Sequence, residues 1–507
     1  MKTLLLPLDE RPCNYIYPQM IASSNKEIQI IVPPKEILGD KKKPADLVEI
    51  ERFLLRNTRE TDNIILSIDM LIYGGLIPSR LHYLSKQDAL SRLYLIKNIK
   101  LANPKIKIYA FNCIMRTPQY NSSDEEPDYY AEYGYALFRR KYLLDYKDRH
   151  GLNEQELSEL GSIKIPNDIF YDYDTRREFN EFINIEVVNF LEAGYIDFLV
   201  IPQDDSSPYG YTAISQKNVI RHIEQKKLDM KVMIYPGADE VALSLLTRAY
   251  HDFKGIQLKI HAFYSSILGP SIVPLYEDRP MFESLKSHVR VCRAKLVMNP
   301  DEADFILAIN SPGKIMQETY DKNIDITYTS CRNLLDFALQ IKDYIEAEKP
   351  LALCDSAFCN GGDIQLIRYL DGLDILDKLK SYAGWNTNCN TLGTCLAQAC
   401  LGEGINIFNL LYRIIEDVCY QAFVRHDIIE SDIPLIEYIH DISVNDISNG
   451  LAVIEDLIRK KLQENYETLQ IGKKYPVRIK KVYSPWKRMF EIGMDMELGR
   501  NERVGWY

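Results

Sequence analysis

Two stretches of the sequence each place a pair of carboxylates directly after a run of apolar residues. In IDFLVIPQDDSSPYGY the pair is Asp204 and Asp205, and in KVMIYPGADEV it is Asp239 and Glu240. Like charges a few ångströms apart cannot all ionise, so neighbouring carboxyl groups acquire different pKa values. One can then stay protonated and act as an acid, while another stays ionised and acts as a base or nucleophile. These four residues are the predicted catalytic pool.

The segment between the two stretches indicates that the pairs meet. SQKNVIRHIEQKKLDM has helical spacing, so the whole unit reads strand, helix, strand. Such a unit has parallel strands and a right-handed crossover. The carboxyl ends of both strands then lie at one edge of the sheet, called the rim below, where α/β folds bind their ligands. We expect all four carboxylates at this rim.

Other predicted strands also end in charged residues. The runs TLLLPL, NIILS and IKIYAF lead into acids and arginines. An arginine can hold a carboxylate through two parallel hydrogen bonds or bind an anionic substrate. A single Asp at a strand end more commonly caps a helix or forms a turn, so about half of these acids are assigned to structure. The substrate-binding residues predicted here are Asp9, Glu10, Arg11, Asp69, Arg80 and Arg116.

A second polar group lies in AFCNGGDIQLIRYL and YAGWNTNCNTLGT. One tryptophan is surrounded there by amides and hydroxyls. An indole ring can stack on a sugar while amides bind its hydroxyls, although Asn and Thr also simply cap helices. The predicted substrate-binding residues of this group are Asp355, Asn360, Asp363, Trp385, Asn386 and Asn390.

Predicted strands alternate with helices along most of the chain, which indicates an α/β fold with parallel sheets. A chain of 507 residues is too long for one ordinary core. We predict Rossmann-like parallel sheets in two lobes with a helical C-terminal part, and a (β/α)8 barrel with additions is the alternative. The predicted ranges are 1–265 for an N-terminal α/β domain, 266–395 for a second α/β domain and 396–507 for a mostly helical region.

Residues 117–195 lack a clear buried strand and are predicted to be a helical insertion. Either this segment folds over the rim as a lid, or it is a solvated acidic loop followed by ordinary helices. The candidate lid residues are Asp124, Glu125, Tyr129, Tyr130 and Tyr133. Further along, PLYEDRP at 274–280 resembles PLDERP at 7–12, through either an internal duplication or, as the short match favours, chance.

Composition excludes several classes of protein. A net charge of −11 argues against binding to nucleic acid or anionic membranes. No apolar run approaches the roughly 20 residues of a membrane span, and the opening MKTLLLPLDERP is too short in apolar residues for a signal peptide. The ten cysteines include no C-x-x-C pair and are interpreted as reduced thiols. A cytoplasmic protein is predicted.

Familiar cofactor and metal motifs are missing from the sequence. It contains no GxxxxGK[ST], GxSxG or HExxH, and no GxGxxG follows the first strand. The eight histidines are scattered, so a histidine-based zinc site is not expected. We predict no cofactor and no bound metal, and any cation would have to be one that carboxylates hold.

The segments LPLDERP, YGGLIPSR, IPQDDSSPYG, YPGADE and YAGWNTNCNTLGT together resemble a bacterial family, domain of unknown function 4127. The resemblance spans essentially the whole chain. It implies a full-length bacterial member of that family and names no reaction, so the catalytic assignments rest on residue chemistry alone.

Three functions are compatible with these residues. The first is a carbohydrate-active enzyme, a glycoside hydrolase with paired carboxylates as general acid and base or nucleophile. The second is a protein that binds or senses a sugar or another small molecule without turnover. The third is a divalent-metal-dependent hydrolase with the same aspartates as ligands. A sugar-like small molecule is the expected partner, without nucleic acid or membrane.

Overall fold

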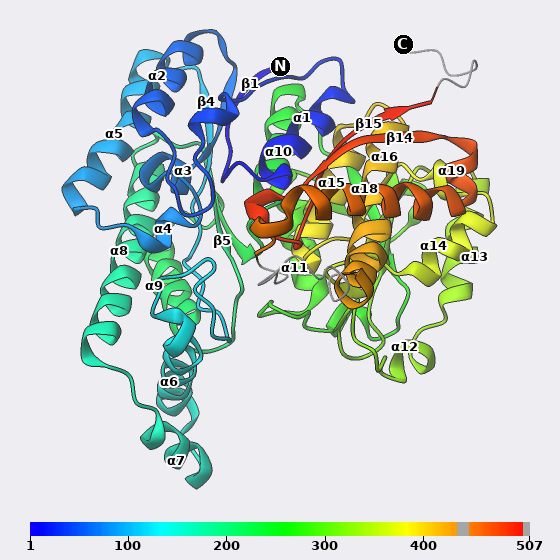
Figure 1. Cartoon of the computed structure of the whole chain (residues 1–507). Coiled ribbons are helices and arrows are strands. Elements are labelled where there is room, and N and C mark those ends of the chain that lie inside the picture. Colours follow the sequence, from blue (N-terminus) through cyan, green and yellow to red (C-terminus); the bar gives the residue numbers. More distant parts are fainter. Residues whose placement is uncertain (433–445, 500–507) are drawn as a thin grey trace. The chain divides into compact units, whose positions relative to one another are not determined.

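The computed structural model describes residues 1–432 and 446–499 and forms two compact units (Figure 1). Unit 1 comprises Met1–Gln19, Lys26–Phe253 and Tyr276–Asp278, and unit 2 comprises Met20–Asn25, Lys254–Leu275 and Arg279–Tyr507. Each unit therefore takes one short segment from the other half of the chain. The three domain ranges derived from the sequence stay a prediction.

Unit 1 is built on a sheet of six parallel strands in the order β2-β1-β3-β4-β5-β6. Strand β3 is buried at all five positions, as expected for a parallel strand with both faces covered. Because β1 lies between β2 and β3, the winding direction reverses there, which is the switch point of doubly wound folds. The strands are β1 (Lys2–Leu6), β2 (Gln29–Ile31), β3 (Asn63–Ser67), β4 (Lys107–Phe111), β5 (Phe198–Gln203) and β6 (Val232–Pro236).

Helices connect these strands, and their apolar faces cover the sheet. In α2, for example, Ile50 and Leu54 lie one turn apart and are the buried residues of the helix. Residues 117–195, the predicted insertion, contain the helices α6, α7 and α8. The helices are α1 (Pro12–Ser23), α2 (Leu47–Asn57), α3 (Ile68–Tyr73), α4 (Pro78–Leu81), α5 (Lys86–Ala102), α6 (Tyr130–His150), α7 (Glu154–Ser162), α8 (Asn167–Glu192), α9 (Tyr211–Lys226) and α10 (Val241–Lys254).

Unit 2 contains a sheet of five parallel strands in the order β13-β11-β9-β7-β8. Its first strand again lies between the second and the third, so both sheets wind in the same order. The strands are β7 (Lys259–Tyr264), β8 (Lys295–Leu296), β9 (Phe305–Asn310), β11 (Leu351–Asp355) and β13 (Ser381–Ala383). Two open parallel sheets confirm the predicted α/β fold and exclude the (β/α)8 barrel.

The two similar peptides each follow the first strand of a sheet. PLDERP follows β1 and leads into α1, while PLYEDRP follows β7 and precedes α11 (Met281–Val291). In both cases the next strand lies at an edge of its sheet. This shared position, together with the shared winding order, favours internal duplication over the chance match that the sequence alone favoured.

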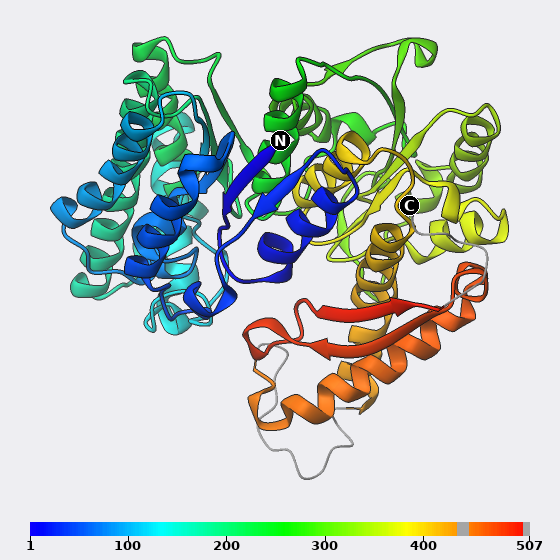
Figure 2. The same ribbon diagram turned by 90° about the horizontal axis from the view of Figure 1, so that it is seen from above.

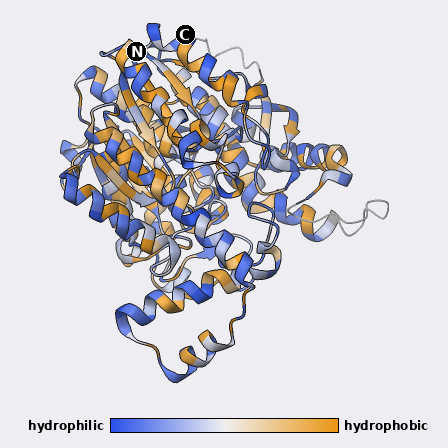
Figure 3. Cartoon of the chain, turned by 90° about the vertical axis from the view of Figure 1, so that its left-hand side faces the viewer, coloured by the Kyte–Doolittle hydropathy of each residue, from blue (hydrophilic) through white to orange (hydrophobic). Residues whose placement is uncertain are grey.

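The remainder of unit 2 is mostly helical and closes with an antiparallel strand pair packed along α18 (Figure 2). Apolar and polar residues alternate along its helices as they do elsewhere in the chain (Figure 3). Within residues 1–432 and 446–499, no helix is both long and apolar enough to span a bilayer. The elements are β10 (Gln317–Glu318), α12 (Thr327–Ser330), α13 (Leu334–Glu346), β12 (Phe358–Cys359), α14 (Ile364–Gly372), α15 (Asn388–Leu401), α16 (Ile407–Arg413), the π-helix η6 (Ile414–Val424), α17 (Arg425–Asp427), the π-helix η7 (Ile428–Asp432), α18 (Leu451–Thr468), α19 (Gln470–Lys474), β14 (Val477–Tyr483) and β15 (Gly493–Leu498).

Candidate functional site

The rim of the unit 1 sheet gathers the charged residues that follow its strands. Arg11, beyond β1, contacts Asp239, beyond β6, through Nη2 and Oδ1 at 2.6 Å. These strands are four spacings apart, about 19 Å in a flat sheet. The twist of the sheet and the loops beyond the strand ends therefore bring the charged residues after β1 and β6 into contact.

One side of the rim is a buried cluster around Asp239. Arg11 bridges it to Asp9, whose Oδ2 lies 2.7 Å from Nη2, and Asn14 Nδ2 donates to both carboxylates at 3.0 Å. Burial raises the pKa of Asp239 to about 7, with repulsion from Asp9 adding to the effect and Arg11 opposing it. Beside this cluster, Glu10 Oε1 accepts a hydrogen bond from the backbone N–H of Lys41 at 2.9 Å. Asp239 is thus a carboxyl group that is still partly protonated near neutral pH.

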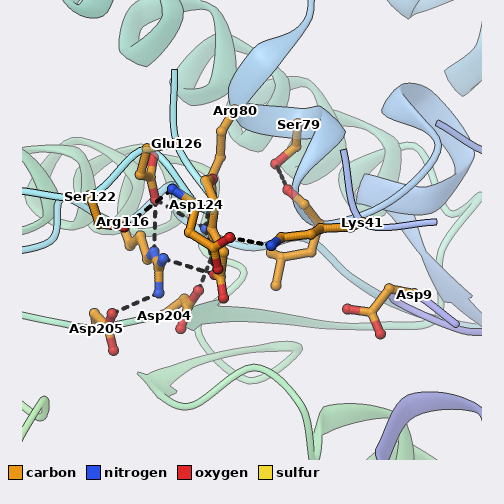
Figure 4. Close-up of polar contacts among 12 residues, drawn as sticks. Asp9, Lys41, Ser79, Arg80, Arg116, Ser122, Asp124, Glu126, Asp204 and Asp205 are labelled. Atoms are coloured by element: carbon orange, nitrogen blue, oxygen red, sulfur yellow. Dashed lines mark hydrogen bonds and ion pairs between the residues drawn. The ribbon is translucent and has the colours of Figure 1, made fainter. Parts of the chain in front are cut away.

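The other side is an ion network in which two arginines serve four carboxylates. Arg80 Nη2 lies 2.6 Å from Asp204 Oδ2, and Arg116 Nη1 lies 2.9 Å from Asp205 Oδ2. Figure 4 shows Arg116 pointing at Asp205, with Glu126 above it (Figure 4). Both arginines also share Glu126 Oε1, at 3.0 and 2.8 Å. The rim network, as we call it, consists of Arg80, Arg116, Glu125, Glu126, Asp204 and Asp205.

Burial raises the pKa of Asp205 to about 6. Repulsion from Asp204 is the second cause, and the guanidinium groups of Arg116 and Arg80 oppose both. The Asp205 side chain nevertheless keeps 22% of its surface exposed. Its backbone has a φ of 45°, a left-handed conformation that costs energy in a non-glycine residue and is found disproportionately at functional sites. The exposed part of the side chain leaves Asp205 accessible to solvent.

Glu240 lies deeper than the other predicted catalytic residues and has no exposed surface. It packs under the turn at Gly237, where a Cβ would lie 2.9 Å from Glu240 Oε2. The φ of 118° at this glycine is likewise unfavourable for any other residue. Glu240 as a catalytic group stays a prediction, and the geometry favours Asp205 and Asp239.

Asp69, in the first turn of α3, lies at the switch point of the sheet. It accepts hydrogen bonds from the Cys113 N–H at 2.9 Å and from Asn112 Nδ2 at 3.3 Å. Burial raises its pKa to about 6. Burial and the charge of Asp69 also raise the pKa of Tyr73, whose hydroxyl has no hydrogen-bond partner among the described residues.

The acidic residues of the candidate lid, within residues 117–195, lie at the rim. Asp124 pairs with Lys41, and Glu125 lies 2.8 Å from Arg116. Glu126 was missed as a site residue by sequence reasoning, although it adjoins two candidate lid acids. Only the three-dimensional structure distinguishes Glu126, which is 1% exposed and pairs with both arginines, from Glu125, which is partly exposed to solvent. A lid motion stays a prediction.

In unit 2 the rim carries a separate buried cluster around Asp355. Its oxygens accept from Asn310 Nδ2 at 2.8 Å, from the Asp363 N–H at 2.8 Å and from the Tyr382 hydroxyl at 3.0 Å. Burial, with repulsion from Asp363 second, raises the pKa of Asp355 to about 7. Asp363 caps α14 and pairs with Arg332 at 2.8 Å.

The remaining predicted residues of unit 2 shape the turns around α15. Asn360 Nδ2 donates to Glu318 at 2.8 Å, and its N–H donates to the Asn386 carbonyl at 2.9 Å. Trp385 is 3% exposed, and its indole N–H donates to the Thr394 hydroxyl, within α15, at 3.2 Å. Asn390 is buried within α15. In this conformation Trp385 packs inside unit 2, and sugar binding by these residues stays a prediction.

The rim carboxylates are paired with arginines and amides and do not converge on one point as metal ligands do. Among the described residues, no group of three or more His, Cys, Asp or Glu side chains is arranged to hold a metal ion. The sequence predictions of no metal and no cofactor stay predictions.

Two parallel sheets of the same winding order, with polar side chains at the strand carboxyl ends, define an α/β protein of two Rossmann-like units. A family model described as "Protein of unknown function (DUF4127)" matches residues 3–495, and the chain belongs to this family. No curated protein matches the chain. A solved structure entitled "S. aureus MnaA-UDP co-structure" is similar at 9% identity, over 82% of this chain and 94% of that one. Its TM-score of 0.18 is too low to support any inference.

The first prediction concerns the stability of the rim network. Replacing Arg80, which is 1% exposed, with Met leaves buried carboxylates without their cation. We expect the free energy of unfolding in urea to fall by about 3–5 kcal/mol. The control Arg52→Met removes an exposed pair with Glu49 and should cost about 0–1 kcal/mol. Equal losses in the two variants would contradict the network.

The second prediction uses the raised pKa of Asp239. The folded protein keeps this proton up to about pH 7, whereas the unfolded chain loses it near pH 4. The contribution of this group to stability is therefore present below about pH 4 and is lost as the pH rises to about 7. Asp239→Asn cannot titrate, so its unfolding free energy relative to wild type should increase from pH 4.5 to pH 7.5. The exposed control Asp229→Asn should show no such trend.

Proposed function

We propose that the rim of unit 1 is the active site of a carbohydrate-active enzyme, a glycoside hydrolase that uses Asp205 and Asp239 as its acid–base pair. The observation that carries the proposal is the raised pKa of both carboxyls, about 6 and about 7, at the ends of the adjacent strands β5 and β6. Perturbed carboxyl groups close to one another are a common property of active sites.

The two environments favour different roles. Asp239, with its pKa raised to about 7, is still partly protonated at neutral pH and in that form can donate its proton to the glycosidic oxygen as the bond breaks. Asp205 ionises above about pH 6 and is accessible, so it can activate water or attack the sugar. Arg116 and Arg80 would steady the negative charge that Asp205 carries in this step.

The two alternative functions remain distinguishable by experiment. A binding or sensing protein would take up the same sugar-like ligand without product formation, and a metal-dependent hydrolase would lose activity in chelator. The pairing of Asp204 and Asp205 with arginines favours acid–base chemistry, because a carboxylate neutralised by a guanidinium is a weaker ligand for a cation.

The third prediction separates enzyme from binder. Asp205→Asn keeps the shape of the side chain and removes the titrating group. We expect kcat on chromogenic glycosides to fall by about 10²–10⁴, while ligand affinity from calorimetry changes far less. Asp229→Asn, on the surface, is the matched control. An Asp205→Asn variant that turns over like wild type would remove this residue from the mechanism.

The fourth prediction is the shape of the pH profile. A base must be ionised, so kcat/KM should fall as the pH drops below about 6, the pKa of Asp205. An acid must be protonated, so kcat/KM should also fall as the pH rises above about 7, the pKa of Asp239. Asp205→Asn should flatten the acidic limb only. A profile that is level from pH 5 to pH 8 would rule out both assignments.

A further inference from the structure

A cavity of about 450 Å³ in unit 1 adjoins the loop that carries Asp205. Ser207, in this loop, lines the cavity, and its Cα lies within about 7 Å of the Asp205 Cα because only Ser206 lies between them. The facing wall is one side of α9, where lining residues recur at helical spacing. A ligand in this cavity would therefore extend toward the proposed catalytic group.

The cavity carries an excess of positive charge. Arg149, Lys217 and Arg221 line it, against the carboxylates of Glu224 and Asp278. This excess is notable in a chain whose net charge is −11. A further cavity of unit 1, about 590 Å³, has no such excess, because its three cationic side chains face three aspartates. Of these two cavities, the one beside Asp205 therefore has the excess of positively charged side chains.

The walls of the cavity are held in place. Arg149 Nε donates to Asp145 Oδ1 at 2.9 Å, and its guanidinium lies 5.4 Å from the centre of the Tyr209 ring. Gln216 Nε2 donates to the side chain of Gln203, the last residue of β5, at 2.8 Å. Because these contacts already hold the Arg149 side chain in place, it loses little further conformational freedom when it binds a ligand.

One residue that lines the cavity also has a buried hydroxyl without a hydrogen-bond partner. Ser207 is 6% exposed, and its Oγ has no hydrogen-bond partner among the described residues. A buried hydroxyl without a partner is costly, so a ligand oxygen that accepts from it would be stabilised. Cations and a donor hydroxyl together match an anionic oxygen group.

We propose that this cavity binds the carboxylate or phosphate of an acidic sugar, so that the enzyme acts on acidic glycosides. The assignment rests on the proposed function for the placement of the scissile bond at Asp205. Arg149, Lys217 and Arg221 hold the anionic group, and the Ser207 hydroxyl donates to it.

Calorimetry on the full-length chain tests the proposal with three probes: glucuronic acid, glucose 6-phosphate and neutral glucose. We expect at least one acidic sugar to bind about tenfold or more tightly than glucose, and which one does so distinguishes carboxylate from phosphate. Raising the salt concentration should weaken that binding and leave glucose unaffected. Lys217→Gln/Arg221→Gln, at two exposed positions of α9, should abolish the preference.

Lys164→Gln removes one exposed positive charge that does not line the cavity and should keep the preference. Arg149→Gln gives an independent second test, with the same loss expected as for the α9 variant. The proposal is overturned if neither acidic sugar binds better than glucose, or if Lys164→Gln loses the preference as fully as the cavity variants.

The outcome is separable from that of the proposed function, because binding is measured without turnover. An acidic preference that persists in a protein with no glycosidase activity would leave the cavity assigned and the catalytic proposal refuted. Hydrolysis of neutral glycosides without any acidic preference would do the reverse.

Discussion

The sharing of two buried guanidinium groups among four carboxylates is the constraint on which the unit 1 rim depends. Arg80 and Arg116 cannot fully neutralise Glu125, Glu126, Asp204 and Asp205, and burial penalises every charge that remains. Burial, with repulsion from Asp204 second, raises the pKa of Asp205 to about 6, so proton uptake by this carboxyl group relieves part of the mismatch.

The two rims solve the problem of buried carboxylates differently. In unit 1, cations from three strand ends hold the acids, so the network is strongly charged. In unit 2, Asp355 is held by an amide, a hydroxyl and a backbone N–H, which are neutral donors, and only its neighbour Asp363 pairs with a guanidinium, that of Arg332. Neutral donors stabilise a carboxylate less than a guanidinium does, but they do not require a second charge to be buried.

Much of this architecture follows from the sequence, because apolar runs of strand length and the charged residues after them are local signals. The runs before Asp9, Asp69 and Asp204 all form parallel strands, and the charges beyond them lie at one rim. Partnerships between distant residues carry no such signal. Nothing local separates Glu126, buried between two arginines, from Glu125 beside it. The burial of Trp385 likewise depends on how α15 packs within its unit, which residue type alone does not specify.

The exchange of short segments between the two units has a consequence for synthesis on the ribosome. The loop after β5 is fixed partly by the hydrogen bond from the Ser206 N–H to the Tyr276 carbonyl, at 3.0 Å, and Tyr276–Asp278 belongs to unit 1. The strands of the first sheet are complete by Pro236, so the nascent chain can form that sheet before this fastening segment emerges. The loop bearing Asp205 thus acquires its final backbone only after the second half has begun to appear. An unfinished chain would carry a folded sheet while the loop that bears Asp205 is still unformed.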